Sequence, residues 1–274
     1  MKNLFAPIFY SHFYISLCSI AAYLYGKWML TFTPFVQSDY IMAAMVFAST
    51  LATYTLTRKK VLTLAKDEDL PARVKWWLSK QSLFKVFMAM AVLIFLFGMF
   101  FVQLESLIIL GLLGIISVFY SVKIPVINIS LRQVPLLKTI WIALIWASIA
   151  SFLPLYQAQL PALHYDFWME KGLALFLQQF LFILAITIPF DIRDIELDID
   201  KNIKSIPILI GAKSSLYLSV LLLATASIFF DLNAILTILS IVFIAIGYAK
   251  KQEWYYLVLL DSTIILQFLL CGIL

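Results

Sequence analysis

The feature that most limits what this chain can fold into is a series of long apolar runs. Nine such runs lie at about 8–30, 40–57, 83–102, 105–122, 136–156, 171–190, 215–230, 232–248 and 254–273. Within a lipid bilayer, the backbone satisfies its hydrogen bonds only as helices or as a closed barrel. Barrel strands alternate in polarity over roughly 10 residues, whereas these runs are continuous and about 20 residues long, the length of a membrane-spanning helix. The sequence therefore predicts an all-α, multi-pass transmembrane bundle of about nine helices.

The composition supports an integral membrane protein with one domain. Hydrophobic residues make up 64% of the 274 residues and charged residues 13%, which leaves too little polar surface to cover a soluble globule. No polar stretch is long enough for a soluble domain, so we expect residues 1–274 to form a single transmembrane domain. Adjacent runs must turn sharply near Gln103 and Asp231.

The basic residues predict the orientation of the bundle. Lysine and arginine prefer cytoplasmic loops, and with the N-terminus in the cytoplasm only Lys27 and Lys171 of the 20 basic residues fall outside. Nine spans then place the C-terminus outside, in a protein of a bacterial-type inner membrane. Lys138 is interpreted as one of the cytoplasmic anchors. The formal net charge of +5 follows from this bias, so the lipid bilayer is the expected environment and no nucleic-acid partner is needed.

An acidic segment follows the sixth run. It contains five carboxylates within ten positions: Asp191, Asp194, Glu196, Asp198 and Asp200. Like charges repel and each loses water near a bilayer, so a divalent cation is the simplest reason to keep them together. If the sixth helix continues through this segment, Asp191, Asp194 and Asp198 share one stripe. Carboxylates spaced in this way suit Mg²⁺ bridged to a substrate phosphate.

Two interpretations of the acidic segment are open. It is either a metal site or a solvated loop whose charges pair with Arg193, Lys201 and Lys204. A family resemblance favours the first. Residues 191–211 read D-x-x-D-x-E-x-D and then K-S-x-P-x-L-x-G, which resembles the second aspartate-rich motif of the UbiA-type intramembrane prenyltransferases.

The resemblance extends over essentially the whole chain. The family also has nine helices, with acidic chemistry on the loop after the sixth. A Y-S-x-K segment after the fourth run contains Tyr120 and Lys123, and the last run carries Tyr255, Tyr256 and Asp261. These pieces are similar to the family as well, although they are less specific than the second motif.

The resemblance implies transfer of a prenyl group. Family members bind an isoprenyl diphosphate through Mg²⁺ and pass the prenyl group to an acceptor, which here is expected to be lipophilic and either aromatic or a quinone precursor. Metal and basic residues stabilise the charge that builds on the leaving diphosphate, and aromatic walls shelter the allylic cation. By this resemblance Asp194 and Asp198 are catalytic magnesium ligands supported by Asp191. Lys123 and Lys204 contact phosphate oxygens, and Lys123 is also assigned a catalytic role.

The first aspartate-rich motif of the family is missing. Its pattern, N-D-x-x-D-x-x-x-D, belongs after the second helix, where this chain has Thr55, Leu56 and Lys59 at the positions of the asparagine and the first two aspartates. In one interpretation Arg58 and Lys59, with Lys60, replace a metal by binding the diphosphate directly. In another these basic residues only anchor the helix end.

The missing motif leaves a second functional hypothesis. A catalytically silent family member would keep the fold and hold a prenyl lipid, or scaffold a partner, without turnover. A CDP-alcohol phosphotransferase is disfavoured, because the D-G and A-R pairs of that family's motif are absent from DIRDIELDIDKNIKS. The leading expectation is thus a Mg²⁺-dependent prenyl transferase, with the silent member as its alternative.

Overall fold

The structure is a computed structural model that describes residues 10–64, 75–76, 79–121, 134–158, 165–200, 203–249 and 255–271. Within these ranges the regular secondary structure is helical, which confirms the predicted all-α fold. The elements are α2 (Phe13–Thr31), α3 (Gln37–Leu64), α5 (Gln81–Gly98), α6 (Leu104–Ser121), α7 (Leu137–Ala150), α8 (Phe152–Gln157), α9 (Tyr165–Arg193), α10 (Ile195–Asp200), α11 (Ile206–Ile210), α12 (Ala212–Phe230), α13 (Ala234–Ala249), the π-helix η3 (Tyr255–Leu260) and α14 (Asp261–Cys271).

Each of the nine apolar runs coincides with one long helix or with two consecutive helices. The run at 136–156 forms α7 and α8, and the run at 254–273 forms η3 and α14. The predicted turns lie between α5 and α6 and between α12 and α13, where Asp231 has a φ of 54°. Such a left-handed residue commonly ends a helix. The hydrophobic pattern was therefore sufficient to place the long helices, while the short helices α10 and α11 lie between the apolar runs.

Three stretches of the described residues are long and apolar enough to cross a membrane. They are Leu137–Gln157, Asp166–Arg193 and Ala212–Phe230, and several shorter apolar helices accompany them. Large apolar side chains are exposed on the outer helices, including Leu93, Phe97, Phe100, Leu221, Ile228, Phe229, Ile235 and Ile238. Exposed apolar surface of this extent is expected where helices face lipid.

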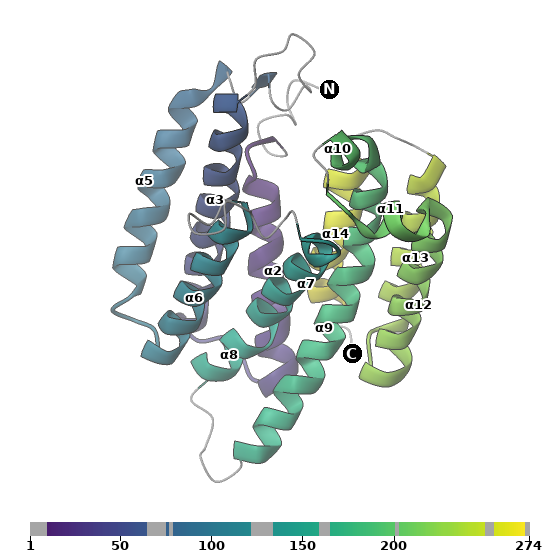
Figure 1. Ribbon diagram of the computed structural model, residues 1–274. Coiled ribbons are helices and arrows are strands. Elements are labelled where there is room, and N and C mark those ends of the chain that lie inside the picture. Colours follow the sequence, from purple (N-terminus) through teal and green to yellow (C-terminus); the bar gives the residue numbers. More distant parts are fainter. Residues whose placement is uncertain are drawn as a thin grey trace.

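The long helices lie side by side as a bundle, with α5 at one side and α12 and α13 at the other (Figure 1). Helix α9 packs mainly against α7 and α12, α3 packs against α5 and α2, and α14 packs against α2. The two short helices α10 and α11 lie at one end of the bundle, which is also the end at which α3 finishes (Figure 1). Helix α8 and the start of α9 lie at the opposite end (Figure 1).

A proline explains the break between α7 and α8, and a glycine allows the close contact of α7 with α2 at that break. Pro154 has no N–H to donate to the carbonyl of Ala150, four residues earlier, and its ring disfavours the regular helix there. A Cβ atom added to Gly26 of α2 would lie 1.6 Å from that carbonyl oxygen. The backbones of α2 and α7 therefore touch, as small residues allow in membrane bundles.

Candidate functional site

The acidic segment is almost entirely helical. Helix α9 ends at Arg193, Asp194 forms a turn, and α10 begins at Ile195. The backbone N–H of Asp194 donates to the Phe190 carbonyl at 3.0 Å, and the N–H of Asp198 donates to the Asp194 carbonyl at 2.9 Å. Helical hydrogen bonding thus continues across the turn, as expected from the sequence.

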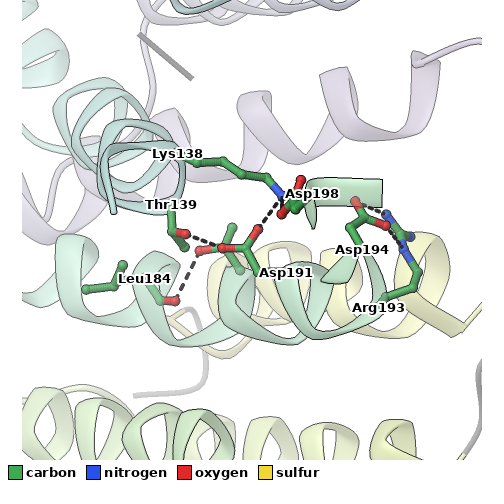
Figure 2. Close-up of polar contacts among 8 residues, drawn as sticks. Lys138, Thr139, Leu184, Asp191, Arg193, Asp194 and Asp198 are labelled. Carbon is green, nitrogen blue, oxygen red and sulfur yellow. Dashed lines mark hydrogen bonds and ion pairs between the residues drawn. The ribbon is translucent and has the colours of Figure 1, made fainter. Parts of the chain in front are cut away.

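Two of the three predicted aspartates meet at a lysine. The Lys138 ammonium lies 2.7 Å from Oδ1 of Asp191 and 2.6 Å from Oδ2 of Asp198, and the Thr139 hydroxyl donates to Oδ2 of Asp191 (Figure 2). The side chains of Lys138, Asp191 and Asp198 are only 7%, 4% and 1% exposed. We call these four residues the Lys138 cluster. The cluster joins the first turn of α7 to the end of α9 and to α10.

The third predicted aspartate lies apart from this cluster. Asp194 accepts two hydrogen bonds from its neighbour Arg193, at 2.8 Å from Nε and 3.2 Å from the terminal nitrogen (Figure 2). The Arg193 guanidinium carbon also lies 5.3 Å from the centre of the Phe190 ring and 5.0 Å from that of Tyr256. Both charged side chains keep some exposure, 14% for Arg193 and 16% for Asp194. Asp194 is therefore the most accessible of the three carboxylates.

The basic residues predicted to bind diphosphate are described only in part. Arg58 and Lys59 belong to the last part of α3, at the same end of the bundle as α10 (Figure 1), and their side chains lie outside the described structure. Lys123 lies outside the described residues. Lys204 is exposed, and its carbonyl accepts a hydrogen bond from the N–H of Leu136 at 3.0 Å. That bond ties the start of α7 to the loop after α10.

The carboxylates of Asp191 and Asp198 could bind a cation, but the Lys138 ammonium already lies between them. No group of three or more His, Cys, Asp or Glu side chains that could hold a metal ion occurs among the described residues. Asp191 and Asp198 nevertheless direct one oxygen each at a single point, and carboxylate oxygens are the donors that Mg²⁺ prefers. The cation at that point is the ammonium of Lys138. Glu196 and Asp200, the other two carboxylates of the acidic segment, are exposed.

Sequence reasoning missed the role of Lys138. We interpreted it as a membrane anchor, but it is buried and paired with two aspartates. One signal could have indicated this: Lys138 lies inside the apolar run at 136–156 rather than before it. An ionisable residue within a span almost always has a partner in the bundle interior. The two partners are distant in sequence, so local spacing alone does not identify them.

Comparison with known proteins agrees with the fold. The profile of the UbiA prenyltransferase family matches residues 74–265. No curated protein matches the chain in sequence. Among solved structures, the chain resembles the apo structure of a UbiA homologue from Aeropyrum pernix K1, with a TM-score of 0.67 and 17% identity over 94% of this chain and 98% of that one.

Two further structures have the same fold. A UbiA homologue from Archaeoglobus fulgidus, bound to GPP and Mg²⁺, has a TM-score of 0.59 and 14% identity over 98% of this chain and 100% of that one. A structure concerned with digeranylgeranylglyceryl phosphate synthase in membranes has a TM-score of 0.57 and 19% identity over 100% and 99% of the two chains. At these identities the likeness supports the fold alone.

Proposed function

Because the chain belongs to the UbiA prenyltransferase family, we propose that it transfers an isoprenyl group from a prenyl diphosphate to a lipophilic acceptor, aromatic or a quinone precursor. In this reaction the allylic carbon–oxygen bond breaks and diphosphate leaves. A bond forms between the prenyl carbon and the acceptor, and the acceptor releases a proton. The observation that carries the proposal is the acidic segment formed by the end of α9 and by α10, which places buried and accessible carboxylates at one end of an apolar bundle.

We assign the metal to this segment. Asp191, Asp194 and Asp198 would hold Mg²⁺, which would neutralise the diphosphate oxygens when it is bound. Asp194 is accessible enough to meet an incoming ion, whereas the other two are held by Lys138. The Archaeoglobus fulgidus homologue bound to GPP and Mg²⁺ supports the same choice of metal and substrate class here.

The basic and aromatic residues have separate roles in the proposal. Arg58, Lys59, Lys123 and Lys204 would contact the phosphate oxygens, and Lys123 would assist departure of the diphosphate. Aromatic rings near this end of the bundle, of which Tyr256 already lies against the guanidinium of Arg193, would offer faces that favour positive charge. Such a face stabilises a developing allylic cation and keeps water away from it.

The membrane assignment extends the same proposal. We propose that residues 1–274 form a single multi-pass domain in a bacterial-type inner membrane, with the N-terminus in the cytoplasm and the C-terminus outside. The apolar helices and the distribution of lysine and arginine support this topology. The prenyl diphosphate would then bind at the cytoplasmic end, where α3 finishes and α10 lies (Figure 1).

A catalytically silent protein is the second candidate. Two observations favour it: the first aspartate-rich motif is missing around Thr55, and an ammonium already fills the position between Asp191 and Asp198. Such a protein would bind a prenyl lipid or scaffold a partner without turnover. Release of diphosphate over many cycles excludes it.

Binding of a prenyl diphosphate to the purified chain tests the proposal. We expect magnesium-dependent binding that is lost when Asp194 and Asp198 are both replaced by alanine. Replacing the exposed Glu196 and Asp200 by alanine removes the same charge from the same segment and is expected to leave binding intact. Equal affinity in the two double variants would show that the metal assignment is wrong.

A further inference from the structure

The Lys138 cluster holds two carboxylates together by means of a protein side chain. The ammonium lies within 2.7 Å of one oxygen from each aspartate, and all three side chains are less than a tenth exposed. Charge-assisted hydrogen bonds of this length are strong and directional. Asp191 is fixed further by the Thr139 hydroxyl. The pair is therefore stabilised as it stands by a cation that belongs to the chain.

The same two oxygens are the ones that a divalent ion would need. Mg²⁺ binds carboxylate oxygens at about 2.0–2.1 Å with near-octahedral geometry. An ion bridging Asp191 and Asp198 requires the space that the Lys138 ammonium fills and the lone pairs to which it donates. The ammonium and the metal thus exclude each other from this position.

We propose that Lys138 is a resident cation that competes with divalent metal for Asp191 and Asp198. In the free protein it keeps the two carboxylates paired and metal-free, so the ion can occupy them only when the ammonium is displaced. Asp194 is the most exposed of the three carboxylates, and its partner Arg193 is more exposed than Lys138. It is therefore the first carboxylate that an incoming metal–diphosphate complex meets. The inference rests on the proposed function only in taking Mg²⁺ as the metal concerned.

Removal of the lysine provides the test. Without its ammonium, two buried carboxylates face each other and need another cation, because burial of unpaired charge is costly. We expect Lys138→Met to bind Mn²⁺, an oxygen-seeking substitute for Mg²⁺, at least about tenfold more tightly than the unaltered chain. The measurement is the loss of the free Mn²⁺ signal in electron paramagnetic resonance, on the full chain in detergent without prenyl diphosphate.

Two control variants separate this effect from general electrostatics. Lys213→Met removes an equal charge from an exposed position at the start of α12 and is expected to leave Mn²⁺ affinity unchanged. The double variant Lys138→Met with Asp198→Asn removes one of the two carboxylates and is expected to lose the gain. The thermal midpoint of Lys138→Met should also rise with added Mn²⁺, whereas that of the unaltered chain should not.

The outcomes against the proposal are equally definite. Equal Mn²⁺ affinity in Lys138→Met and the unaltered chain overturns it, as does an equal gain in Lys213→Met. If Lys138→Met folds only when Mn²⁺ is present, the proposal stands, and failure to fold even then refutes it. A lack of prenyl diphosphate binding by the unaltered chain would count against the proposed function alone, because the Mn²⁺ measurement contains no prenyl lipid.

Discussion

Replacing Gly26 with alanine tests the closest backbone contact in the bundle. The new Cβ would lie 1.6 Å from the carbonyl oxygen of Ala150 and 2.5 Å from its carbonyl carbon. A real Cβ atom essentially never comes within 3.0 Å of such a neighbour. The clash is with backbone rather than with a flexible side chain, so the helices themselves must move. To bring the Cβ–oxygen distance from 1.6 Å to 3.0 Å, α2 and α7 must separate by about 1.4 Å along that contact.

The size of the effect follows from two opposing contributions. Overpacking a well-filled interface costs about 1–3 kcal/mol, and a clash with backbone favours the upper end of that range. Alanine in place of glycine within a helix returns about 0.5–1 kcal/mol. We therefore expect Gly26→Ala to lower the free energy of unfolding by about 2 kcal/mol.

Reversible unfolding of the purified protein in mixed detergent micelles measures this change. Gly111→Ala in α6 is the matched control, because a Cβ there has no neighbour within 4 Å. That variant is expected to be neutral or more stable by about 0.5–1 kcal/mol. A Gly26→Ala protein as stable as the Gly111→Ala protein would refute the close approach of α2 and α7.

Two further predictions concern the diphosphate site and the bundle core. Replacing Arg58 and Lys59 together with alanine is expected to weaken prenyl diphosphate binding more than about tenfold, because both supply positive charge to the phosphate. Titration with a labelled prenyl diphosphate measures the loss of affinity. A loss smaller than about tenfold would support the interpretation that Arg58 and Lys59 only anchor the end of the helix. Gln178→Leu is expected to lower stability by about 1–3 kcal/mol, because the Tyr25 hydroxyl, which donates to Gln178 at 2.8 Å, and the Phe230 carbonyl lose a buried partner. An unchanged unfolding midpoint would show that these bonds contribute nothing.

Local pattern was enough to predict the helices. Continuous apolar runs require backbone hydrogen bonds within each segment, so length and hydropathy were enough to place the long helices. The break at Ala150 was not predicted, although Pro154 was visible in the sequence. A proline bends or breaks a membrane helix to a degree that depends on what packs beside it. Here the freed carbonyl lies against Gly26, which only the fold reveals.

The candidate site was predictable only within its own segment. Spacing placed Asp191, Asp194 and Asp198 on one stripe of a helix, but the turn at Asp194 accompanies its pairing with Arg193. The pairing of the other two with Lys138 depends on how α7 packs against α9. Their role as magnesium ligands stays a prediction. Tertiary contacts between helices that are distant in sequence determine which charged residues pair, and these contacts cannot be predicted from the spacing of residues within one segment.

The Lys138 cluster also sets an order of events during synthesis of the chain. Asp198 follows Lys138 by 60 residues, and ribosomes add about 5–20 residues per second. The lysine therefore emerges about 3–12 s before the last of its partners exists. Until Asp191 and then Asp198 have been made, the Lys138 ammonium lacks these two partners, and an apolar environment disfavours an unpaired charge. The two ion pairs of the cluster can form only after α10 has been made, so we expect α7 to dock against α9 and α10 late in synthesis.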